Sequence, residues 1–295
     1  MKTNIKGGGV ALITPFKDSG EIDFEALERL LNRVISGGAD YLVVLGTTAE
    51  TPTLSAEERI AVTKFVIEKN NGKLPIVLGI GGNCTVDVVR SIQTTDLEGV
   101  DAILSVTPYY NKPSQEGIYQ HYKTIAEASP RPIVMYNVPG RTGVNMAAAT
   151  TLRLAHECKN IIAVKEASGN IAQAAYILRD RPEGFYVISG DDNLTLPMMA
   201  MGGDGVISVA VNAYPEKFCR MVHALQQGDV KTAASLHLEM MEATDALFAE
   251  GNPVGVKAAL TYYGVIRNNL RLPLVASSAA LDARLKNLIE RYDLK

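Results

Sequence analysis

The sequence predicts an α/β fold, namely a (β/α)8 TIM barrel with a C-terminal helical domain. Three observations indicate this fold. Eight short apolar runs alternate with stretches of helical period over most of the chain. The midpoints of successive runs, from Leu12 to Ile207, lie between 19 and 34 residues apart, which is the size of one βα unit. The last part of the 295-residue chain has helical period and no strand pattern.

The eight apolar runs are the predicted strands. Their hydrophobicity is continuous rather than alternating, which is typical of parallel strands buried on both faces. The runs are GGVALIT (8–14), YLVVLGT (41–47), PIVLGIG (75–81), AILSVTP (102–108), PIVMYNVP (132–139), IIAVKEAS (161–168), YVISGDD (186–192) and GVISVAV (205–211). Eight strands match a barrel, whereas a doubly wound open sheet more often has about five or six.

Two crossover helices have clear start signals. Residues 24–36 follow Asp23, a favourable N-cap, and residues 55–70 begin with Ser55 and Glu58 at the spacing of a capping box. Both stretches are predicted to be amphipathic helices that connect parallel strands.

The chain after the eighth predicted unit is helical by period. Three stretches, residues 229–251, 256–266 and 278–293, carry this pattern. The sequence therefore predicts two domains, a catalytic barrel over 1–228 and a C-terminal helical domain over 229–295.

The composition limits the kinds of molecule that the protein is expected to bind. The net charge is −3, from 29 basic and 32 acidic residues that are interspersed, so no basic face suits nucleic acid. No apolar stretch approaches the roughly 18 residues of a membrane span. Cys84, Cys158 and Cys219 are far apart and odd in number, which favours free thiols in a reducing compartment. We expect a cytoplasmic protein without a targeting signal, whose partners are small molecules or copies of itself.

The carboxyl ends of barrel strands, and the loops after them, are where functional groups are expected. These positions are rich in hydroxyl groups and include one lysine within a predicted strand. The polar and glycine residues there are Thr14, Thr47, Thr48, Tyr109, Tyr110, Tyr136, Arg141, Lys165, Glu166, Gly190, Asp191 and Asp192.

Lys165 stands at the end of the apolar run IIAVK, where another aliphatic residue would be usual. An unpaired ammonium in apolar surroundings costs several kcal/mol, so such an amine finds a partner or becomes neutral. A neutral amine can attack a ketone or an aldehyde to form an imine. The alternative is a structural ion pair, although Glu166 should face the opposite way because it is the next residue in the strand.

The motif YNVPGRTG favours the catalytic interpretation. Tyr136 ends the predicted strand beside that of Lys165, so its hydroxyl could move protons, while Arg141 offers a planar fork for a carboxylate. Thr47 in GTTAE could relay a proton. Taken singly, Tyr136 and Arg141 are better explained as a packing tyrosine and a surface arginine, and GTTAE alone is weak evidence because it also fits a turn that caps a helix.

Neither a metal nor a cofactor is expected. Asp191 and Asp192 have no histidine or further acid near them in sequence, and the glycines of GIGGNC do not have the dinucleotide-binding spacing. The four histidines fall on predicted helices, away from the strand ends.

Five motifs occur in the order and spacing of one known family. They are GTTAE, TPYYNKPSQEG, YNVPGRTG, VKEASG and SGDD, and they extend over essentially the whole chain. The sequence resembles the dihydrodipicolinate synthase (4-hydroxy-tetrahydrodipicolinate synthase) family of bacterial lysine biosynthesis. Related pyruvate-dependent aldolases, such as N-acetylneuraminate lyase, usually lack the arginine after YNVP.

The resemblance implies a pyruvate imine on Lys165, which loses a proton to form an enamine that attacks the aldehyde of L-aspartate 4-semialdehyde. It also implies a proton relay of Tyr136, Thr47 and Tyr110, and a carboxylate site at Arg141.

By the same resemblance, Thr48, Gly190 and Ile207 line the site, and Thr48 helps to hold a substrate carboxylate. Tyr110 would reach in from a neighbouring subunit. We therefore expect a homotetramer, a dimer of dimers with Tyr110 crossing the dimer interface.

The chain departs from the family pattern in two places. Ala49 replaces the usual glycine of GTTGE, and we expect it to tilt the turn slightly without loss of activity.

The second departure concerns the site at which lysine inhibits many members of the family. By the resemblance, Asn83, Asp87 and Tyr109 match that site, but Ala56 and Arg59 replace residues that are often histidines. Inhibition by lysine is therefore not expected.

Two other functions remain open at this point. One is a related pyruvate aldolase that acts on a sugar acid such as N-acetylneuraminate or 2-keto-3-deoxygluconate. The other is a noncatalytic metabolite-binding barrel in which Lys165 is ion-paired.

Overall fold

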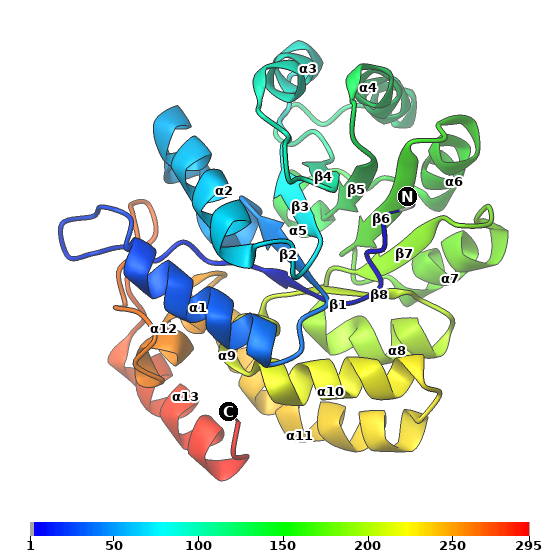
Figure 1. The fold of residues 1–295 in the computed structure, drawn as a ribbon. Helices are drawn as coiled ribbons and strands as arrows, with labels where there is room; N and C mark the ends of the chain where they lie inside the picture. The colour runs from blue at the N-terminus through cyan, green and yellow to red at the C-terminus, as the bar shows by residue number, and fades with distance from the viewer. Residues whose placement is uncertain (1–2, 295) are drawn as a thin grey trace. The chain divides into compact units, whose positions relative to one another are not determined.

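The structure is a computed structural model that describes residues 3–294. Within these residues, eight strands form a closed barrel in the order β1 to β8 (Figure 1). The strands are β1 (Gly7–Ala11), β2 (Tyr41–Val44), β3 (Ile76–Gly79), β4 (Ala102–Val106), β5 (Ile133–Asn137), β6 (Ile161–Glu166), β7 (Tyr186–Ser189) and β8 (Gly205–Ser208). Each strand overlaps one of the predicted runs, so the predicted barrel is confirmed.

The chain divides into two compact units. The central unit comprises Pro75–Ile207 with the described part of residues 1–6, and the terminal unit comprises Gly7–Leu74 with the described part of Ser208–Lys295. The terminal unit is thus built from both ends of the chain. The predicted division into 1–228 and 229–295 stays a prediction.

In the central unit, neighbouring strands pair in parallel from β3 to β8. The pairing of β5 with β6 aligns Tyr136 with Lys165, and the pairing of β6 with β7 aligns Lys165 with Ile188. The helical segments of this unit are α3 (Thr85–Thr94), α4 (Gln115–Ala128), α5 (Pro139–Thr142), α6 (Ala148–Glu157), α7 (Ile171–Asp180), η3 (Asp192–Leu194) and α8 (Thr195–Ala200).

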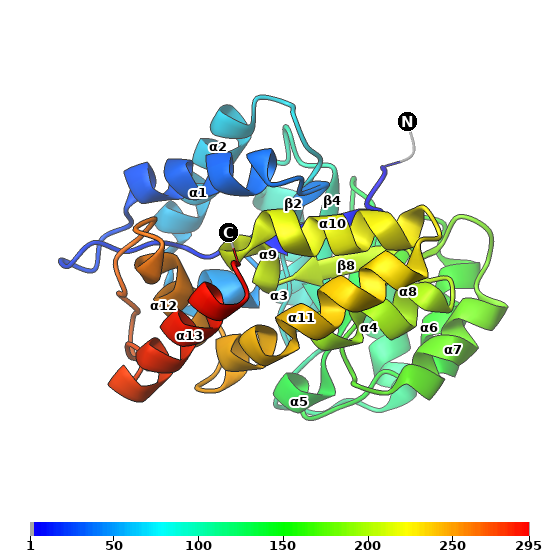
Figure 2. The same ribbon diagram turned by 90° about the horizontal axis from the view of Figure 1, so that it is seen from below.

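In the terminal unit, β1 pairs in parallel with β2. Helices α10 and α11 lie side by side in both views (Figures 1 and 2). The helical segments of this unit are α1 (Phe24–Ser36), η1 (Thr47–Ala49), η2 (Thr51–Thr53), α2 (Ala56–Asn70), α9 (Ala210–Ala213), α10 (Pro215–Gln226), α11 (Val230–Phe248), α12 (Val254–Tyr262) and α13 (Ala279–Arg291).

The predicted helix starts are confirmed. Asp23 accepts a hydrogen bond from the backbone nitrogen of Ala26 at the start of α1. Ser55 and Glu58 form a complete capping box at the start of α2. Of the three helical stretches predicted after residue 228, 229–251 contains α11 and 278–293 contains α13, while 256–266 overlaps α12, which begins two residues earlier. Among the described residues, no helix combines the length and the apolar character that crossing a membrane requires.

Candidate active site

Lys165 lies on β6, within the central unit, and its side chain is buried, with 6% of the residue's surface exposed. Its Nζ lies 4.3 Å from the centre of the Tyr136 ring, on the neighbouring strand β5. Among residues 3–294, no carboxylate lies within ion-pair distance of this amine. An aromatic face stabilises a cation less than a paired acid does. Lys165 therefore lacks the carboxylate partner that a buried structural lysine usually has.

Glu166 is also buried, but it is bonded elsewhere. Its carboxylate accepts hydrogen bonds from Asn137 Nδ2, from the backbone nitrogen of Ser168 and from Gln173 Nε2, at 2.7 to 3.1 Å. These donors satisfy the carboxylate without the lysine. The prediction that Lys165 and Glu166 do not meet is confirmed.

Gly190, directly after β7, lies against Lys165. A Cβ atom built on this glycine would lie 2.7 Å from the Cβ of Ala167 and 3.0 Å from the Cε of Lys165. Any larger residue would therefore push on the lysine side chain. Ile207, on β8, is buried in the barrel wall.

Tyr110 and Arg141 lie on the loops that follow β4 and β5, and both are exposed. The Tyr110 residue is 88% exposed and has a left-handed backbone, with φ at 72°. Its backbone nitrogen donates to the carbonyl of Thr142, in the same short helix as Arg141. The structure thus brings the two loops together, while the Tyr110 ring projects into solvent.

Thr47 and Thr48 lie in the terminal unit, on the 3-10 turn η1 that follows β2. Thr47 is exposed and Thr48 is buried. Leu45 and Glu50, on either side of the turn, have left-handed φ values of 57° and 55°. Ala49 is not among the residues with positive φ, so its methyl group adds no backbone strain there.

Thr48 has a partner that the sequence analysis did not identify. Asn252, between α11 and α12, donates from Nδ2 to Thr48 Oγ1 at 3.0 Å. These two residues are 204 positions apart. No local pattern signals such a contact.

Glu50, at the end of the turn, enters a buried ion pair. Its Oε1 lies 2.5 Å from Nζ of Lys257, on α12, and both side chains are fully buried. Lys257 also donates to the carbonyl of Asn269, and its Nζ lies 4.2 Å from the centre of the Phe16 ring. Burial lowers the pKa of Lys257 to about 8, against the opposing effect of Glu50.

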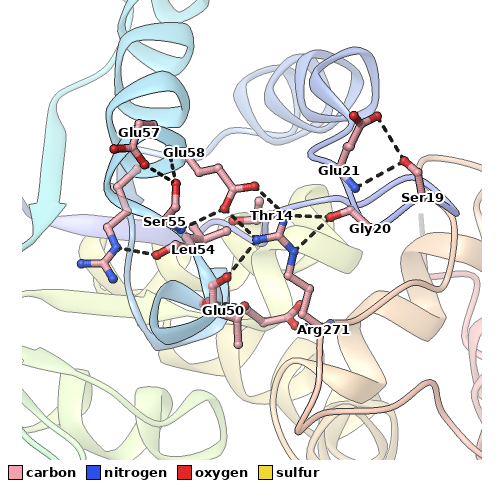
Figure 3. A network of polar contacts seen from close by, with 12 residues as sticks. Thr14, Ser19, Gly20, Glu21, Glu50, Leu54, Ser55, Glu57, Glu58 and Arg271 are labelled. Carbon is pink, nitrogen blue, oxygen red and sulfur yellow. Dashed lines mark hydrogen bonds and ion pairs between the residues drawn. The ribbon is translucent and has the colours of Figure 1, made fainter.

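Arg271 extends this network to the surface of the terminal unit (Figure 3). Its backbone nitrogen donates to Glu50 Oε2, and its guanidinium makes a forked pair with Glu58 at 2.6 and 2.7 Å. The same guanidinium donates to the carbonyls of Gly20 and Thr53. Both ends of the chain are therefore tied together around the turn that carries Thr48.

The residues predicted for a lysine site occupy both units. In the central unit, Asn83 Nδ2 donates to the carbonyl of Tyr109, and Asp87 pairs with Arg90 on its own helix at 3.2 Å. In the terminal unit, Arg59 donates from Nε to the carbonyl of Leu54.

Among the described residues, no group of three or more His, Cys, Asp or Glu side chains could hold a metal ion.

Comparison with known proteins identifies the family of this chain. The sequence model of the dihydrodipicolinate synthetase family matches residues 4–292. A 4-hydroxy-tetrahydrodipicolinate synthase of Parabacteroides distasonis is 54% identical over 292 residues, which cover 99% of this chain and 98% of the relative.

Solved structures are also similar over the full length. A dihydrodipicolinate synthase of Thermotoga maritima has a TM-score of 0.96 at 40% identity, with 100% of both chains covered. A structure described as the first monomeric dihydrodipicolinate synthase variant has a TM-score of 0.96 at 41% identity, and the match covers 98% of this chain and 97% of that one. The chain therefore belongs to the dihydrodipicolinate synthetase family.

Proposed function

We propose that this chain catalyses the 4-hydroxy-tetrahydrodipicolinate synthase reaction, the condensation of pyruvate with L-aspartate 4-semialdehyde on the diaminopimelate route to lysine. The observation that carries the proposal is the buried Lys165 amine, which lies against Tyr136 and has no carboxylate partner among residues 3–294. The names of the full-length relatives support the same reaction.

The chemistry begins at Nζ of Lys165. The amine attacks the keto carbon of pyruvate, and the former keto oxygen leaves as water to give an imine. A proton on the imine nitrogen makes it positive, so that it withdraws electrons from the methyl carbon. Loss of a methyl proton gives an enamine, which forms a carbon–carbon bond with the aldehyde of the second substrate. The amino group of that substrate then attacks the imine carbon and displaces Lys165, which closes the ring and frees the enzyme.

The proton transfers are assigned to hydroxyl groups. Tyr136 is one candidate, because Nζ of Lys165 lies 4.3 Å from the centre of its ring. We assign Thr47 and Tyr110 to the same relay by their match to the family motifs. Thr48 and Arg141 are assigned to substrate carboxylates, since a hydroxyl and a guanidinium both donate hydrogen bonds to such groups. We assign Gly190 and Ile207 to the lining of the site.

Trapping the imine tests the central claim. Borohydride reduction in the presence of pyruvate should fix the adduct on Lys165, and peptide mass analysis locates it. Lys257 serves as the internal control, because its peptide should stay unmodified. An unmodified Lys165 peptide would contradict the proposal and favour a noncatalytic metabolite-binding barrel.

A substrate panel separates this reaction from the closest alternative. The enzyme should turn over pyruvate with L-aspartate 4-semialdehyde and should not cleave N-acetylneuraminate or 2-keto-3-deoxygluconate. Arg141 supports this specificity, because it offers a charged fork for the carboxylate of the incoming semialdehyde. Cleavage of either sugar acid at a comparable rate would assign the chain to the sugar-acid aldolases.

We propose that the active assembly is a homotetramer, a dimer of dimers in which Tyr110 enters the site of a neighbouring subunit. The exposed Tyr110 ring and its left-handed backbone support this assignment. Mixing Tyr110→Phe subunits with Lys165→Ala subunits should restore about a quarter of wild-type activity, since roughly half of randomly paired dimers then contain one complete site. No recovery would place Tyr110 in the site of its own subunit.

We also propose a cytoplasmic location and a weak response to lysine. The three cysteines carry free thiols, which suits a reducing compartment. Ala56 and Arg59 support the weak response, because an arginine adds positive charge where the ammonium group of lysine would bind. Millimolar lysine should leave the rate essentially unchanged in a coupled assay, and half-inhibition at micromolar lysine would contradict this prediction.

A further inference from the structure

We infer that Asn252 is a positioning residue, which holds the Thr48 hydroxyl so that its hydrogen is directed to a substrate carboxylate. The inference rests on the proposed function, which assigns Thr48 to that carboxylate. It adds a residue from the segment between α11 and α12 to the machinery of the reaction.

The argument starts from the hydrogen-bonding capacity of the two groups. A threonine hydroxyl can donate one hydrogen bond and accept two, whereas an amide NH2 can only donate. Asn252 Nδ2 lies 3.0 Å from Thr48 Oγ1, so the hydroxyl oxygen is the acceptor in this contact. The single hydrogen of Thr48 is therefore left for another acceptor, and accepting a bond strengthens the hydroxyl as a donor.

The other end of the Asn252 amide makes no competing contact. Its Oδ1 is buried and has no hydrogen-bond partner among the described residues. Within residues 3–294, the hydrogen bond that this side chain makes is therefore the one that its Nδ2 donates to Thr48 Oγ1. A change at Asn252 should act through Thr48 rather than through another hydrogen-bond partner.

The buried ion pair fixes both partners. Glu50, two residues after Thr48, and Lys257, five residues after Asn252, form the 2.5 Å contact that joins the turn to α12. The carbonyl of Ala49 also accepts a hydrogen bond from Thr14 Oγ1 at 2.8 Å. Because the turn and the start of α12 are held to each other, the Asn252 amide and the Thr48 hydroxyl are preorganised for their hydrogen bond.

A double-mutant cycle tests whether Asn252 acts through Thr48. Thr48→Val should raise the KM of one substrate by about 10- to 100-fold, because a hydrogen bond to a charged group is lost. Asn252→Ala should raise the KM of the same substrate by about 3- to 10-fold. In the double variant, removing Asn252 should add little to the effect of Thr48→Val.

Asn252→Asp tests the direction of the hydrogen bond. An ionised carboxylate can only accept, so it should capture the Thr48 hydrogen and raise the KM by more than Asn252→Ala does. Wild-type behaviour of Asn252→Asp would overturn the inference, because it would mean that the oxygen of the asparagine normally faces Thr48. Additive effects in the cycle would also overturn it and leave Asn252 a structural residue.

Asn268 provides a matched control. Its Nδ2 donates to Ser277 at 2.8 Å, and its Oδ1 is likewise buried without a partner among the described residues. Asn268→Ala should leave both KM values within about twofold of wild type, whereas a change like that of Asn252→Ala would contradict a specific role for Asn252. Thermal unfolding of each variant checks that the fold is intact, and the nearly isosteric Asn252→Asp keeps the test available if Asn252→Ala does not fold.

Imine trapping distinguishes the two possible failures. If pyruvate and borohydride do not modify Lys165 in the wild-type enzyme, the proposed function fails. If Lys165 is trapped but the cycle is additive, only the role of Asn252 fails. At saturating pyruvate, trapping in Asn252→Ala should reach the wild-type extent, since the variant changes the hold on a carboxylate and leaves the amine in place.

Discussion

Two buried lysines, Lys165 and Lys257, differ in whether an acid is paired with the amine, and this difference separates the proposed nucleophile from a structural lysine. Lys165 and Lys257 both lie over an aromatic ring, at 4.3 Å from Tyr136 and 4.2 Å from Phe16. Lys257 has a carboxylate at 2.5 Å and a carbonyl at 2.9 Å. Lys165 has neither among the residues that the structure describes. Burial alone therefore does not distinguish the two amines, and the paired acid does.

The largest expected effect is on catalysis, at the lysine without an acid. Lys165→Arg should lower kcat by at least about 10³-fold, because a guanidinium cannot form the imine. The free energy of unfolding should change by less than about 1 kcal/mol, since no ion pair is broken. Steady-state kinetics and urea denaturation measure the two quantities. Residual turnover within tenfold of wild type would contradict the assignment of Lys165 as the nucleophile.

The paired lysine should show the opposite pattern. Lys257→Met should lower the free energy of unfolding by about 3 to 5 kcal/mol, because it leaves the Glu50 carboxylate buried without its cation. Adding Glu50→Gln should recover part of that loss, since the unpaired charge is then removed. Urea denaturation of the single and double variants measures the effect. Lys165 should still be trapped by borohydride in whatever fraction of Lys257→Met remains folded.

Gly190→Ala tests how closely the Lys165 amine is held in place. The new methyl group would lie 3.0 Å from the Cε of Lys165 and 2.7 Å from Ala167 Cβ, so the lysine must move. We expect kcat to fall by about 10- to 100-fold, because displacing a reacting group by about 1 Å has costs of that size. Stopped-flow measurement of imine formation should show the same slowing. A wild-type rate would show that the amine tolerates displacement.

The smallest effect is expected at the partly exposed ion pair between Glu58 and Arg271. Hydrogen bonds from Arg271 lower the pKa of Glu58 to about 2, so this carboxylate stabilises the fold above its unfolded pKa of about 4.5. That contribution should be lost as the pH falls from about 4.5 towards 2.

Glu58→Gln isolates this charge, because glutamine keeps the capping box with Ser55. The variant should be less stable than wild type by about 1 kcal/mol at pH 7, an amount reduced by solvent screening of this partly exposed pair. The difference should shrink below pH 4.5 and in high salt. Urea denaturation between pH 3 and 7 measures it, and a difference that is independent of pH would exclude the ion pair as its cause.

Much of the architecture was predictable because its signals are local. The capping box at Ser55 and the N-cap at Asp23 mark helix starts within four residues of sequence, and each strand is a continuous apolar run. The pairing of Tyr136 with Lys165 was also predictable, because it follows from their neighbouring strands. Local patterns of this kind are sufficient to place one half of the candidate site.

The other half of the candidate site could not be predicted, because its contacts join residues that lie far apart in the sequence. Lys257 stands in an apolar helix as Lys165 stands in an apolar strand, so both show the same local anomaly. Only the acid 207 residues away distinguishes them, and no spacing rule encodes that pairing. The contact between Asn252 and Thr48 was missed for the same reason. A lone lysine in an apolar run thus identifies a position to examine, and the structure then shows whether an acid is paired with it.

The composition of the terminal unit has a consequence for synthesis of the protein. Residues Gly7–Leu74 leave the ribosome before Lys257 and Arg271, which satisfy Glu50 and Glu58. At roughly 5 to 20 residues per second, the early segment waits on the order of ten seconds or more for these partners. During that interval its acidic groups have no cations from the chain's end, so a nascent chain that stalls before α12 would be a natural client for chaperones.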